Sequence, residues 1–452
     1  MFVVTLPKDS AHDPLAFAKQ AKKVGADLLE VRGDVTPSVP AFESPLPLIA
    51  TPRGHYALLE NLQARYVDLD HKEEYPVPRG VSVIRSFHDF EKTPSLEELD
   101  IRFQSLHAQG ADIVKIATKV RSLRDIVTLL DLQRHKDGRS RHVILGMGPR
   151  AHLLRLLSPL RNALTYTYLE EGQQSAPGQL PLDFYRYTRH VRNPAIFGLI
   201  GGTDIKSLSP LIHNALFDRA GIDAFYALFL TEDLHDVFES AETLGIRGFS
   251  VTAPFKQNVM EFVSKLDPLA KDLQTVNTVV HGDKGWKGYC TDVAGITEGY
   301  PFLRSCSRAA ILGSGGVVSA AIRACKECGI KDITIFARNA QARESLADAL
   351  KVRSEPLGAA ANTSADVVIC AVPSDVVLPL PSHHGLAYAI DLRYGHETNF
   401  LQSARTAGYA THDGLLMLIH QALAQFKLFT GTEPDFGALS FLLSLLDHHG
   451  KQ

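Results

Sequence analysis

One lysine stands inside an apolar, strand-like run. Lys115 interrupts Asp112-Ile-Val-Lys-Ile-Ala-Thr118. Burial disfavours the charged form of an amine, which lowers its pKa and leaves a nucleophile able to form a Schiff base with a ketone. His88 titrates near neutrality and is the candidate proton shuttle. The alternative is an interior lysine paired with a carboxylate, for which Glu30 or Asp70 would serve.

A glycine turn predicts a second kind of chemistry. The run 308–320 reads as a strand, the turn Gly313-Ser-Gly-Gly316 and a helix, an arrangement that presents backbone N–H groups to a pyrophosphate. The next predicted strand, 332–336, ends at Ala337-Arg338-Asn339. An arginine without an adjacent acid favours a 2′-phosphate, so the expected cofactor is NADP. The alternative is an exposed arginine after a strand.

Polar residues also interrupt apolar elements between these two features. Ser209-Pro210 fits a helix N-cap, which would explain Ser209 without a function. Capping does not explain the rest of the set, which comprises Ser207, Thr252, Lys256, Asn277 and Asp292.

The first half of the chain predicts a (β/α)8 barrel. Most of its strand candidates are separated by helical or loop segments. They are 2–6, 27–32, 47–53, 66–70, 82–88, 112–118, 142–147 and 164–168. The unit is short for this fold, so two or three helices must be short or missing. Polar residues fall toward the carboxyl ends of the strands, where barrel active sites are built.

Composition favours small-molecule partners. The 452 residues carry a net charge of −3 and 21% charged residues, which gives no reason to expect nucleic acid or an anionic membrane. No apolar run approaches the about 18 residues of a membrane helix. The first residues read as a strand rather than a signal peptide, so we expect a cytoplasmic protein. Five sparse cysteines are expected to be reduced, and no metal site is expected.

The first half resembles type I 3-dehydroquinate dehydratase. The motifs are Leu29-Glu-Val-Arg-Gly-Asp34, Ser86-Phe-His-Asp-Phe90, 111–118, Met147-Gly with Arg155, and Ser175-Ala-Pro-Gly-Gln179. The resemblance implies an imine between Lys115 and the substrate ketone, with His88 removing the adjacent proton before water is eliminated. It places Arg155, Ser175 and Gln179 at the substrate carboxylate, and Glu30, Arg32 and Arg53 at its hydroxyls and near His88.

One position departs from that family. The glutamate and glycine pair that normally follow the arginine are replaced by Gly54-His-Tyr-Ala-Leu-Leu-Glu60. Either Glu60 compensates or the contact is absent.

The second half resembles shikimate dehydrogenase over about 198–446. The motifs are Ser207-Leu-Ser-Pro210, His213-Asn214, 250–256, Val276-Asn-Thr278, Gly288-Tyr-Cys-Thr-Asp292, 313–316, Asp391-Leu-Arg-Tyr394 and 414–421. The resemblance implies that Lys256 and Asp292 are the catalytic pair. It assigns substrate binding to Ser207, Ser209, Thr252, Asn277, Tyr394 and Gln421, and cofactor binding to Gly313, Ser314, Gly315, Gly316, Ala337, Arg338, Arg343 and Gly414.

Together these resemblances predict a bifunctional enzyme in three domains. Residues 1–194 form the barrel, 195–302 the dehydrogenase substrate domain with helices from about 414–446 packing back, and 303–413 the NADP-binding Rossmann domain. The predicted reactions convert 3-dehydroquinate to 3-dehydroshikimate, and that product to shikimate. Two alternatives stay open: a quinate/shikimate dehydrogenase that uses NAD and has a weakened dehydratase half, and a non-catalytic ligand-sensing regulator.

Overall fold

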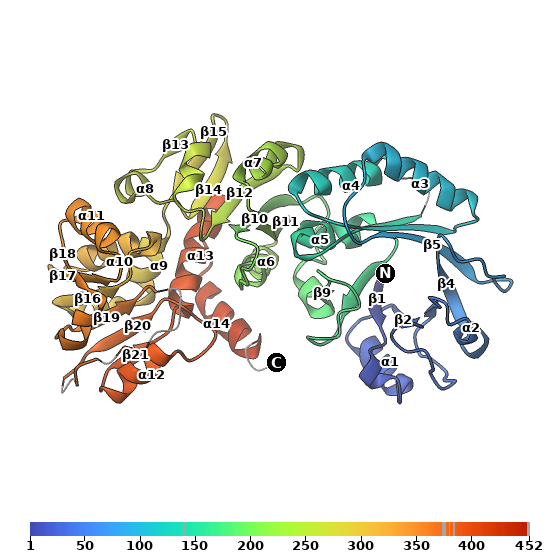
Figure 1. Ribbon diagram of the computed structural model, residues 1–452, viewed down its shortest axis with the longest axis horizontal. Helices are drawn as coiled ribbons and strands as arrows, with labels where there is room; N and C mark the ends of the chain where they lie inside the picture. Colours follow the sequence, from blue (N-terminus) through green and yellow to red (C-terminus); the bar gives the residue numbers. More distant parts are fainter. Residues whose placement is uncertain (137, 139–140, 373–376, 379, 383–384, 450–452) are drawn as a thin grey trace. The chain divides into compact units, whose positions relative to one another are not determined.

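The computed structural model describes residues 1–136, 138, 141–372, 377–378, 380–382 and 385–449. The chain divides into two compact units, Met1–Ile246 and Arg247–Gln452 (Figure 1). This division falls inside the predicted range 195–302, and the predicted domain boundaries stay predictions. No described helix is both long and apolar enough to span a membrane.

The first unit contains a curled, parallel sheet. Its order is β7-β6-β5-β4-β3-β2-β1-β8-β9. The strands are β1 (Phe2–Thr5), β2 (Leu28–Arg32), β3 (Leu48–Thr51), β4 (Ala64–Asp70), β5 (Ser82–Asp89), β6 (Ile113–Lys119), β7 (His142–Met147), β8 (Thr165–Tyr168) and β9 (Leu180–Pro181). Each of the eight predicted strands is present, and β9 is additional.

Backbone hydrogen bonds join the edge strand β7 to the segments that lead into β8 and β9 at the opposite edge of the sheet. At the start of β7, His142 O accepts from Ala163 N–H, which precedes β8, at 2.9 Å. Beyond the other end, Gly148 N–H donates to Pro177 O at 3.1 Å. A Cβ at Gly178 would lie 2.3 Å from Gly148 O, so this close approach requires glycine. The sheet therefore curls into the predicted barrel architecture.

Helices follow only some of the barrel strands. They are α1 (Pro14–Lys23), α2 (Ala57–Asn61), α3 (Leu96–Ala108), α4 (Leu123–Lys136) and α5 (His152–Arg161). The described segments 33–47 and 71–81, which follow β2 and β4, contain no helix. The expectation that two or three helices would be short or missing is therefore confirmed.

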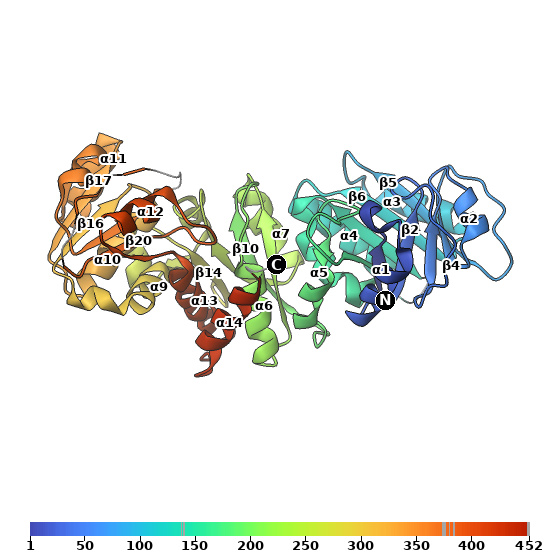
Figure 2. The same cartoon turned by 90° about the horizontal axis from the view of Figure 1, so that it is seen from below.

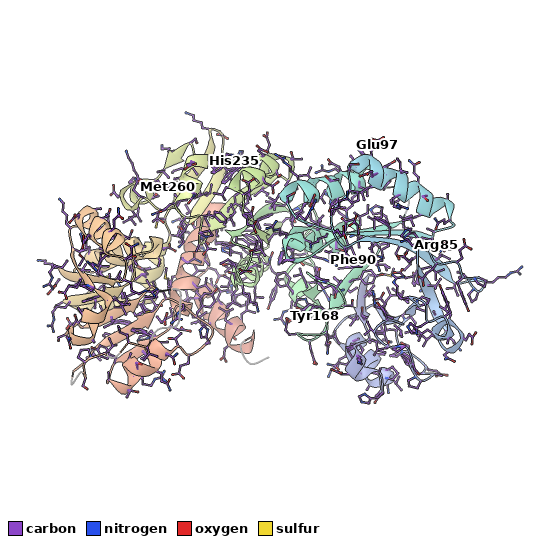
Figure 3. All side chains as sticks on the ribbon, viewed as in Figure 1. Arg85, Phe90, Glu97, Tyr168, His235 and Met260 are labelled. Carbon is purple, nitrogen blue, oxygen red and sulfur yellow. The ribbon has the colours of Figure 1, made fainter. Side chains whose placement is uncertain are left out.

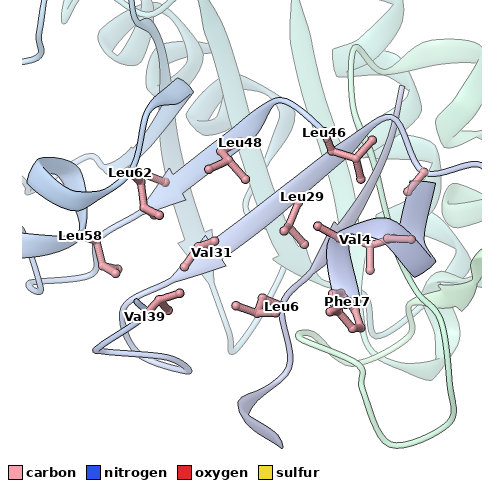
Figure 4. Packing of buried hydrophobic residues seen from close by; sticks show 14 of the residues in the cluster. Val4, Leu6, Phe17, Leu29, Val31, Val39, Leu46, Leu48, Leu58 and Leu62 are labelled. Atoms are coloured by element: carbon pink, nitrogen blue, oxygen red, sulfur yellow. The ribbon is translucent and has the colours of Figure 1, made fainter. Parts of the chain in front are cut away.

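Alternate residues of the barrel strands bury opposite faces of the sheet. Val3 of β1 belongs to a core cluster that also includes Ile49, Ile84 and Val143 from other strands. The next residue, Val4, belongs to a second cluster with Phe17 of α1. Figure 4 shows this second cluster, with Val4 and Phe17 close together. The strands are therefore apolar on both faces, as a helix-covered parallel sheet requires.

The first unit continues beyond the barrel as a strand–helix repeat. Its elements are β10 (Ala195–Gly201), α6 (Ser209–Arg219), β11 (Ala224–Leu230) and α7 (Leu234–Thr243). Strands β10 and β11 pair in parallel over their whole length, from Ala195↔Ala224 to Gly201↔Leu230. The 3-10 helix η2 (Pro149–Ala151) precedes α5, and η3 (Leu182–Tyr187) leads toward β10.

The second unit begins with a small mixed sheet. Strand β12 (Ile246–Val251) pairs antiparallel with β14 (Thr278–Gly282), which forms a hairpin with β15 (Gly285–Tyr289). Strand β13 (Lys265–Leu266) pairs in parallel with β15. The helices here are α8 (Pro268–Leu273), α9 (Asp292–Gly299), α13 (Leu415–Thr430) and α14 (Ala438–His449).

A Rossmann domain completes the second unit. Its parallel sheet has the order β18-β17-β16-β19-β20-β21, the nucleotide-binding order 3-2-1-4-5-6. The strands are β16 (Arg308–Leu312), β17 (Asp332–Ala337), β18 (Arg353–Pro356), β19 (Val367–Cys370), β20 (Tyr388–Asp391) and β21 (Ala410–His412). The helices are α10 (Gly316–Glu327), α11 (Ala340–Leu350) and α12 (Asn399–Thr406). This confirms the fold expected from the glycine turn.

Candidate active sites

Lys115 is buried inside the barrel and bound to a carboxylate. It lies on β6, is 4% exposed, and donates from Nζ to Asp68 Oδ2 at 2.7 Å. The same nitrogen lies 4.1 Å from the centre of the Tyr166 ring. The acidic partner is thus Asp68 of β4, rather than Glu30 or Asp70. A carboxylate thus lies within hydrogen-bond distance of the amine that would attack a ketone.

Asp68 is held as a carboxylate by several donors. Its Oδ1 accepts from Ser86 Oγ at 2.7 Å and from Arg53 Nη2 at 3.1 Å. Burial alone would raise the pKa of Asp68, but Lys115 and Arg53 hold that pKa well below its usual range. A fixed negative charge therefore stays beside the amine of Lys115.

His88 shares the face of the sheet that carries Lys115. Ser86 pairs with Lys115 in the β5–β6 ladder, and His88 lies two residues further along β5, on the same face. Its Nδ1 lies 3.5 Å from Asp70 Oδ2. Burial lowers the pKa of His88, although the contact with Asp70 opposes that shift, so His88 is neutral at pH 7. A neutral imidazole here can accept a proton.

An aromatic ring covers His88 at the mouth of the barrel. The ring of Phe90 stacks on His88 with centroids 5.9 Å apart and an interplanar angle of 9°. Phe90 itself is 69% exposed and follows the end of β5 (Figure 3). His88 is therefore close to the surface from which a ligand would enter.

The glutamate that the dehydratase motif lacks is not replaced by Glu60. Glu60 is exposed on α2. Instead, Glu73 accepts from Arg53 Nη1 at 3.3 Å, from Gly54 N–H at 3.0 Å and from the Tyr56 hydroxyl at 3.2 Å. Sequence analysis missed Glu73, because it follows β4 in a polar segment with no periodic signal. Glu73 therefore binds Arg53 and the first residues of the loop that departs from the family pattern.

A chain of hydroxyl and amide contacts joins Glu30 to the 175–179 loop. Buried Glu30 accepts from Thr51 Oγ1 at 2.8 Å and from Thr5 Oγ1 at 2.7 Å. Thr5 Oγ1 lies 3.0 Å from Ser175 Oγ, which accepts from Gln179 Nε2 at 3.0 Å. The structure therefore brings three predicted site residues together, and adds Thr5 and Thr51 to them.

Among the described residues, Arg32 and Arg155 form no hydrogen bond to Glu30, Ser175 or Gln179. Arg32 binds Asp34 through Nε and Nη2, at 3.1 and 2.8 Å. Arg155 is 2% exposed on α5, and its Nε has no hydrogen-bond partner among the described residues. Burial lowers the pKa of Arg155 to about 10. A buried cation of this kind calls for an anionic ligand, but the substrate role of either arginine stays a prediction.

In the second unit, Lys256 and Asp292 form a second lysine–carboxylate pair. Lys256 Nζ donates to Asp292 Oδ2 at 2.5 Å. Asn277 Nδ2 donates to Asp292 Oδ1 at 2.8 Å, while Asn277 Oδ1 accepts from Thr291 N–H at 2.7 Å. Asp292 is the first residue of α9, where a carboxylate is also favoured by the helix dipole. Asn277 thus fixes the carboxylate that holds the lysine.

The glycine turn lies next to Lys256. Gly313 has φ +124°, and a Cβ there would lie 3.0 Å from Ala371 O. A Cβ on Gly316 would lie 3.5 Å from Thr275 Oγ1 and 4.0 Å from Lys256 Cβ. Thr275 Oγ1 is buried and has no partner among the described residues, a feature that sequence analysis missed. Open backbone at the start of α10, beside a spare hydroxyl, fits a dinucleotide phosphate.

The two candidate 2′-phosphate arginines differ in their surroundings. Arg338 is exposed directly after β17. Arg343 is buried, and it donates through Nη1 to Ala337 O at 3.3 Å and through Nη2 to Glu344 Oε1 at 2.8 Å. Arg338 is therefore the freer cation, and Arg343 already binds protein groups.

Helix α13 brings Gln421 against α9. A Cβ on Gly295 of α9 would lie 3.0 Å from Gln421 Cβ, so the small residue allows the helices to pack closely. Gly414, before α13, also requires glycine, because a Cβ would lie 2.2 Å from Leu392 O. Tyr394 is half-buried after β20. The substrate and cofactor roles of these residues, and of Ser314, stay predictions.

Ser207 and Ser209 lie in the first unit and bind each other. Ser207 Oγ donates to Ser209 Oγ at 3.0 Å and accepts from Ser209 N–H at 3.1 Å. The predicted N-cap role of Ser209 is wrong by one position, because Leu208 is the N-cap and Ser209 begins α6. Thr252 is half-buried in the loop after β12. Their predicted substrate contacts stay predictions.

The part of the chain that the structure describes contains no group of three or more His, Cys, Asp or Glu side chains placed to hold a metal ion.

Comparison with known families agrees with the two kinds of site. Residues 53–191 match the type I 3-dehydroquinase family, and residues 199–279 match the shikimate dehydrogenase substrate-binding domain. Residues 414–439 match the shikimate 5′-dehydrogenase C-terminal domain. Residues 308–386 match the family described as NADP oxidoreductase, coenzyme F420-dependent.

Individual relatives cover both halves. A bifunctional 3-dehydroquinate dehydratase/shikimate dehydrogenase of Arabidopsis thaliana is 28% identical and covers 94% of this chain and 81% of its own length. The shikimate biosynthesis protein AroDE of Chlamydia pneumoniae is 30% identical over 79% of this chain and 74% of its own. A shikimate dehydrogenase (NADP(+)) of Bacillus cytotoxicus is 32% identical over 55% of this chain and 97% of its own.

The fold, the paired lysines and these matches define a fused lyase and oxidoreductase of the α/β class. The chain belongs to the family of bifunctional 3-dehydroquinate dehydratase/shikimate dehydrogenases.

Proposed function

We propose that this protein dehydrates 3-dehydroquinate to 3-dehydroshikimate in its barrel and reduces that product to shikimate with NADPH in its second half. The observation that carries the proposal is the presence of two lysine–aspartate pairs in one chain, one buried and one partly buried. Lys115 lies 2.7 Å from Asp68, and Lys256 lies 2.5 Å from Asp292. The first pair supports covalent chemistry, and the second supports proton transfer.

In the dehydratase reaction, Lys115 Nζ attacks the substrate ketone, and water leaves as the protonated imine forms. His88 accepts the proton from the adjacent carbon, and the imine takes up the released electron pair. Loss of the hydroxyl as water then forms the double bond, with His88 returning the proton, and hydrolysis releases the product. Asp68 remains ionised and stabilises the positive nitrogen throughout.

The remaining barrel residues bind the substrate in this proposal. Arg155 is buried, and its Nε has no hydrogen-bond partner among the residues that the structure describes, which supports its assignment to the substrate carboxylate together with Ser175 and Gln179. Glu30 accepts hydrogen bonds and so suits a substrate hydroxyl as well as its threonine partners. Arg32 and Arg53 supply positive charge at the same ends of β2 and β3.

In the dehydrogenase reaction, Lys256 delivers a proton to the substrate oxygen. The ammonium is held by Asp292, which Asn277 orients. When bound, NADPH supplies the hydride. Residues 313–316 would hold its pyrophosphate, and Arg338 its 2′-phosphate. Ser207 and Ser209 bind the substrate carboxylate, and Thr252, Asn277, Tyr394 and Gln421 its remaining polar groups.

The ligands of this protein are small molecules in the proposal. All five cysteines are buried thiols, which supports residence in the reducing cytoplasm. A net charge of −3 supports neither nucleic acid nor a membrane surface as partner.

The test supplies purified protein with 3-dehydroquinate and either NADPH or NADH, and follows dehydration and cofactor oxidation together. The proposal predicts both reactions, with NADPH preferred. Preference for NADH with little dehydration would instead identify the quinate/shikimate dehydrogenase alternative. Binding of either substrate without turnover would identify the regulator.

A further inference from the structure

Helix α5 of the barrel is buried on more than one side. Its residues 153–158 are buried consecutively, whereas a helix on the outside of a barrel normally buries one stripe. The helix packs on β7 and β8 of the barrel and also on β11, which lies outside it. Figure 2 shows α4 beside α7, and these two helices are in contact. The surface of α5 that would face solvent in an isolated barrel is therefore covered by the next segment of the chain.

The contact with α5 provides a hydrogen-bond acceptor for a backbone N–H group of the edge strand β11. Strand β11 is the last in its sheet, where unpaired backbone groups invite association with other chains. Leu228 N–H of β11 donates to Nδ1 of His152, the first residue of α5, at 3.4 Å. Burial lowers the pKa of His152 to about 4, so the ring is neutral at pH 7 and its Nδ1 can accept. The barrel therefore supplies a partner that the edge strand lacks in its own sheet.

A second contact runs in the opposite direction, from α7 to the start of α4. Asp236 of α7 is 9% exposed, and it accepts from Leu123 N–H at 2.6 Å and from Arg124 N–H at 3.3 Å. These are the first two N–H groups of α4, which have no partner inside the helix. Ser122 Oγ accepts the next one, from Asp125, at 3.3 Å. The N-terminus of a barrel helix is thus completed by a carboxylate from residue 236.

Two ion pairs lie near these contacts, and hydrogen bonds fix the segment at residues 192–193 that joins the barrel to β10. Arg124 pairs with Glu239, and Arg150 Nη2 lies 3.3 Å from Glu232 Oε1. The junction itself is held by Asp223, whose oxygens accept from the N–H groups of residues 192 and 193 at 3.0 and 2.9 Å. The interface therefore has a buried centre and a charged rim, like a specific protein interface.

We propose that the α4–α5 face of the dehydratase barrel is a docking surface for residues 195–246, and that the barrel acts as a structural partner of the dehydrogenase half. Each side completes the other: His152 covers the edge of β11, and Asp236 caps α4. The two halves stay associated without a covalent link. This inference holds whatever the substrates are.

A cleavable junction tests the proposal in the full chain. A protease recognition sequence is inserted between Asn193 and Pro194, and the folded protein is cut and passed over a gel-filtration column at micromolar concentration. The expected result is a single species that contains both fragments and keeps both activities. Separate elution of the two fragments would overturn the proposal.

Substitutions locate the contact. Asp236→Ala removes a charged acceptor of two N–H groups, one of them buried, so the dissociation constant of the cut protein should rise at least about tenfold. Glu242→Ala, an exposed acid on the same helix, should leave it unchanged. Equal constants for the two variants would contradict the assigned role of Asp236. Uncut Asp236→Ala should keep both activities, since residue 236 contacts neither lysine pair.

Exchanging the charges of the exposed Arg124–Glu239 pair tests the interface with variants that should still fold. Arg124 and Glu239 are both exposed, so Arg124→Glu should weaken association through repulsion by Glu239. Adding Glu239→Arg to the same chain should restore it. If the double variant were as weak as Arg124→Glu alone, the pairing across this interface would be wrong.

Discussion

Asp70 Oδ2 lies 3.5 Å from Nδ1 of His88, and this carboxylate comes from the strand next to the one that carries the imidazole. The contact orients the imidazole of His88. It also opposes the effect of burial on the pKa of His88, since burial lowers that pKa and Asp70 raises it. Asp70 is thus a positioning residue for the proposed base.

Replacing Asp70 tests this role through a pH profile. In Asp70→Asn the pKa of His88 should fall further, because the group that raises it is gone. The acidic limb of dehydratase kcat/KM should therefore move to lower pH, and kcat should drop about tenfold or more as the ring loses its orientation. Asp70→Glu should recover part of the rate. Glu74→Gln, on a neighbouring exposed acid, should change neither quantity. An acidic limb at an unchanged pH in Asp70→Asn would refute the assignment.

A substitution at Lys256 should impair the dehydrogenase activity and leave the dehydratase activity intact. Lys256→Gln removes the proton donor held by Asp292, so shikimate oxidation should slow by about 10²- to 10⁴-fold. Dehydration should continue at the normal rate, since Lys115 has its own carboxylate partner. Both rates are measured on one preparation, with exposed Lys265→Gln as the control. A parallel fall of the two activities would instead indicate damage to the fold.

Arg338 should determine the choice between NADPH and NADH. Loss of a charge-assisted contact costs about 1.5–3 kcal/mol, so Arg338→Leu should raise the KM for NADPH at least about tenfold and leave the KM for NADH unchanged. Because Arg338 is exposed, the Tm should not change. Lys331→Leu, at the other end of β17, is the matched control. Equal effects on both cofactors would mean that Arg338 does not bind a 2′-phosphate.

His152 should make the folded protein sensitive to acid. Its pKa is about 4 in the folded state and about 6.5 in an unfolded chain, so the unfolded state binds the proton more readily. His152 therefore contributes no pH dependence above about 6.5, and stability is lost as the pH falls from about 6.5 to about 4, by about 3 kcal/mol at most.

The variant His152→Gln keeps an acceptor for Leu228 N–H but cannot titrate. Its Tm should fall less between pH 7 and pH 5 than that of the unchanged protein, while exposed His107→Gln should follow the unchanged protein. Parallel Tm curves for His152→Gln and the unchanged protein would show that His152 is not buried in a neutral form.

Local sequence patterns were sufficient for the strands, the Rossmann turn and the chemistry-bearing lysines. Lys115 is conspicuous because a charged residue interrupts an apolar strand, and that feature needs no knowledge of distant contacts. Its partner was not predictable in this way. Glu30 lies on β2 and Asp68 and Asp70 lie on β4, and only the register of β4, β5 and β6 selects Asp68.

The contacts of Glu73 and Asp236 were not predicted for the same reason. Glu60 is nearer in sequence to Arg53 than Glu73 is, yet the turn after β4 brings Glu73 to the arginine. Asp236 caps a helix that begins more than a hundred residues earlier. Such contacts depend on how elements pack, and no local periodicity encodes them.

The most direct test of the account traps the covalent intermediate. The protein is incubated with 3-dehydroquinate and borohydride, digested, and the modified lysine is located by mass spectrometry with fragmentation that separates Lys115 from Lys119 on the same strand. The account predicts one reduced adduct, on Lys115, and loss of dehydration with dehydrogenase activity retained. An adduct on any other lysine, or active dehydration without a trappable adduct, would contradict it.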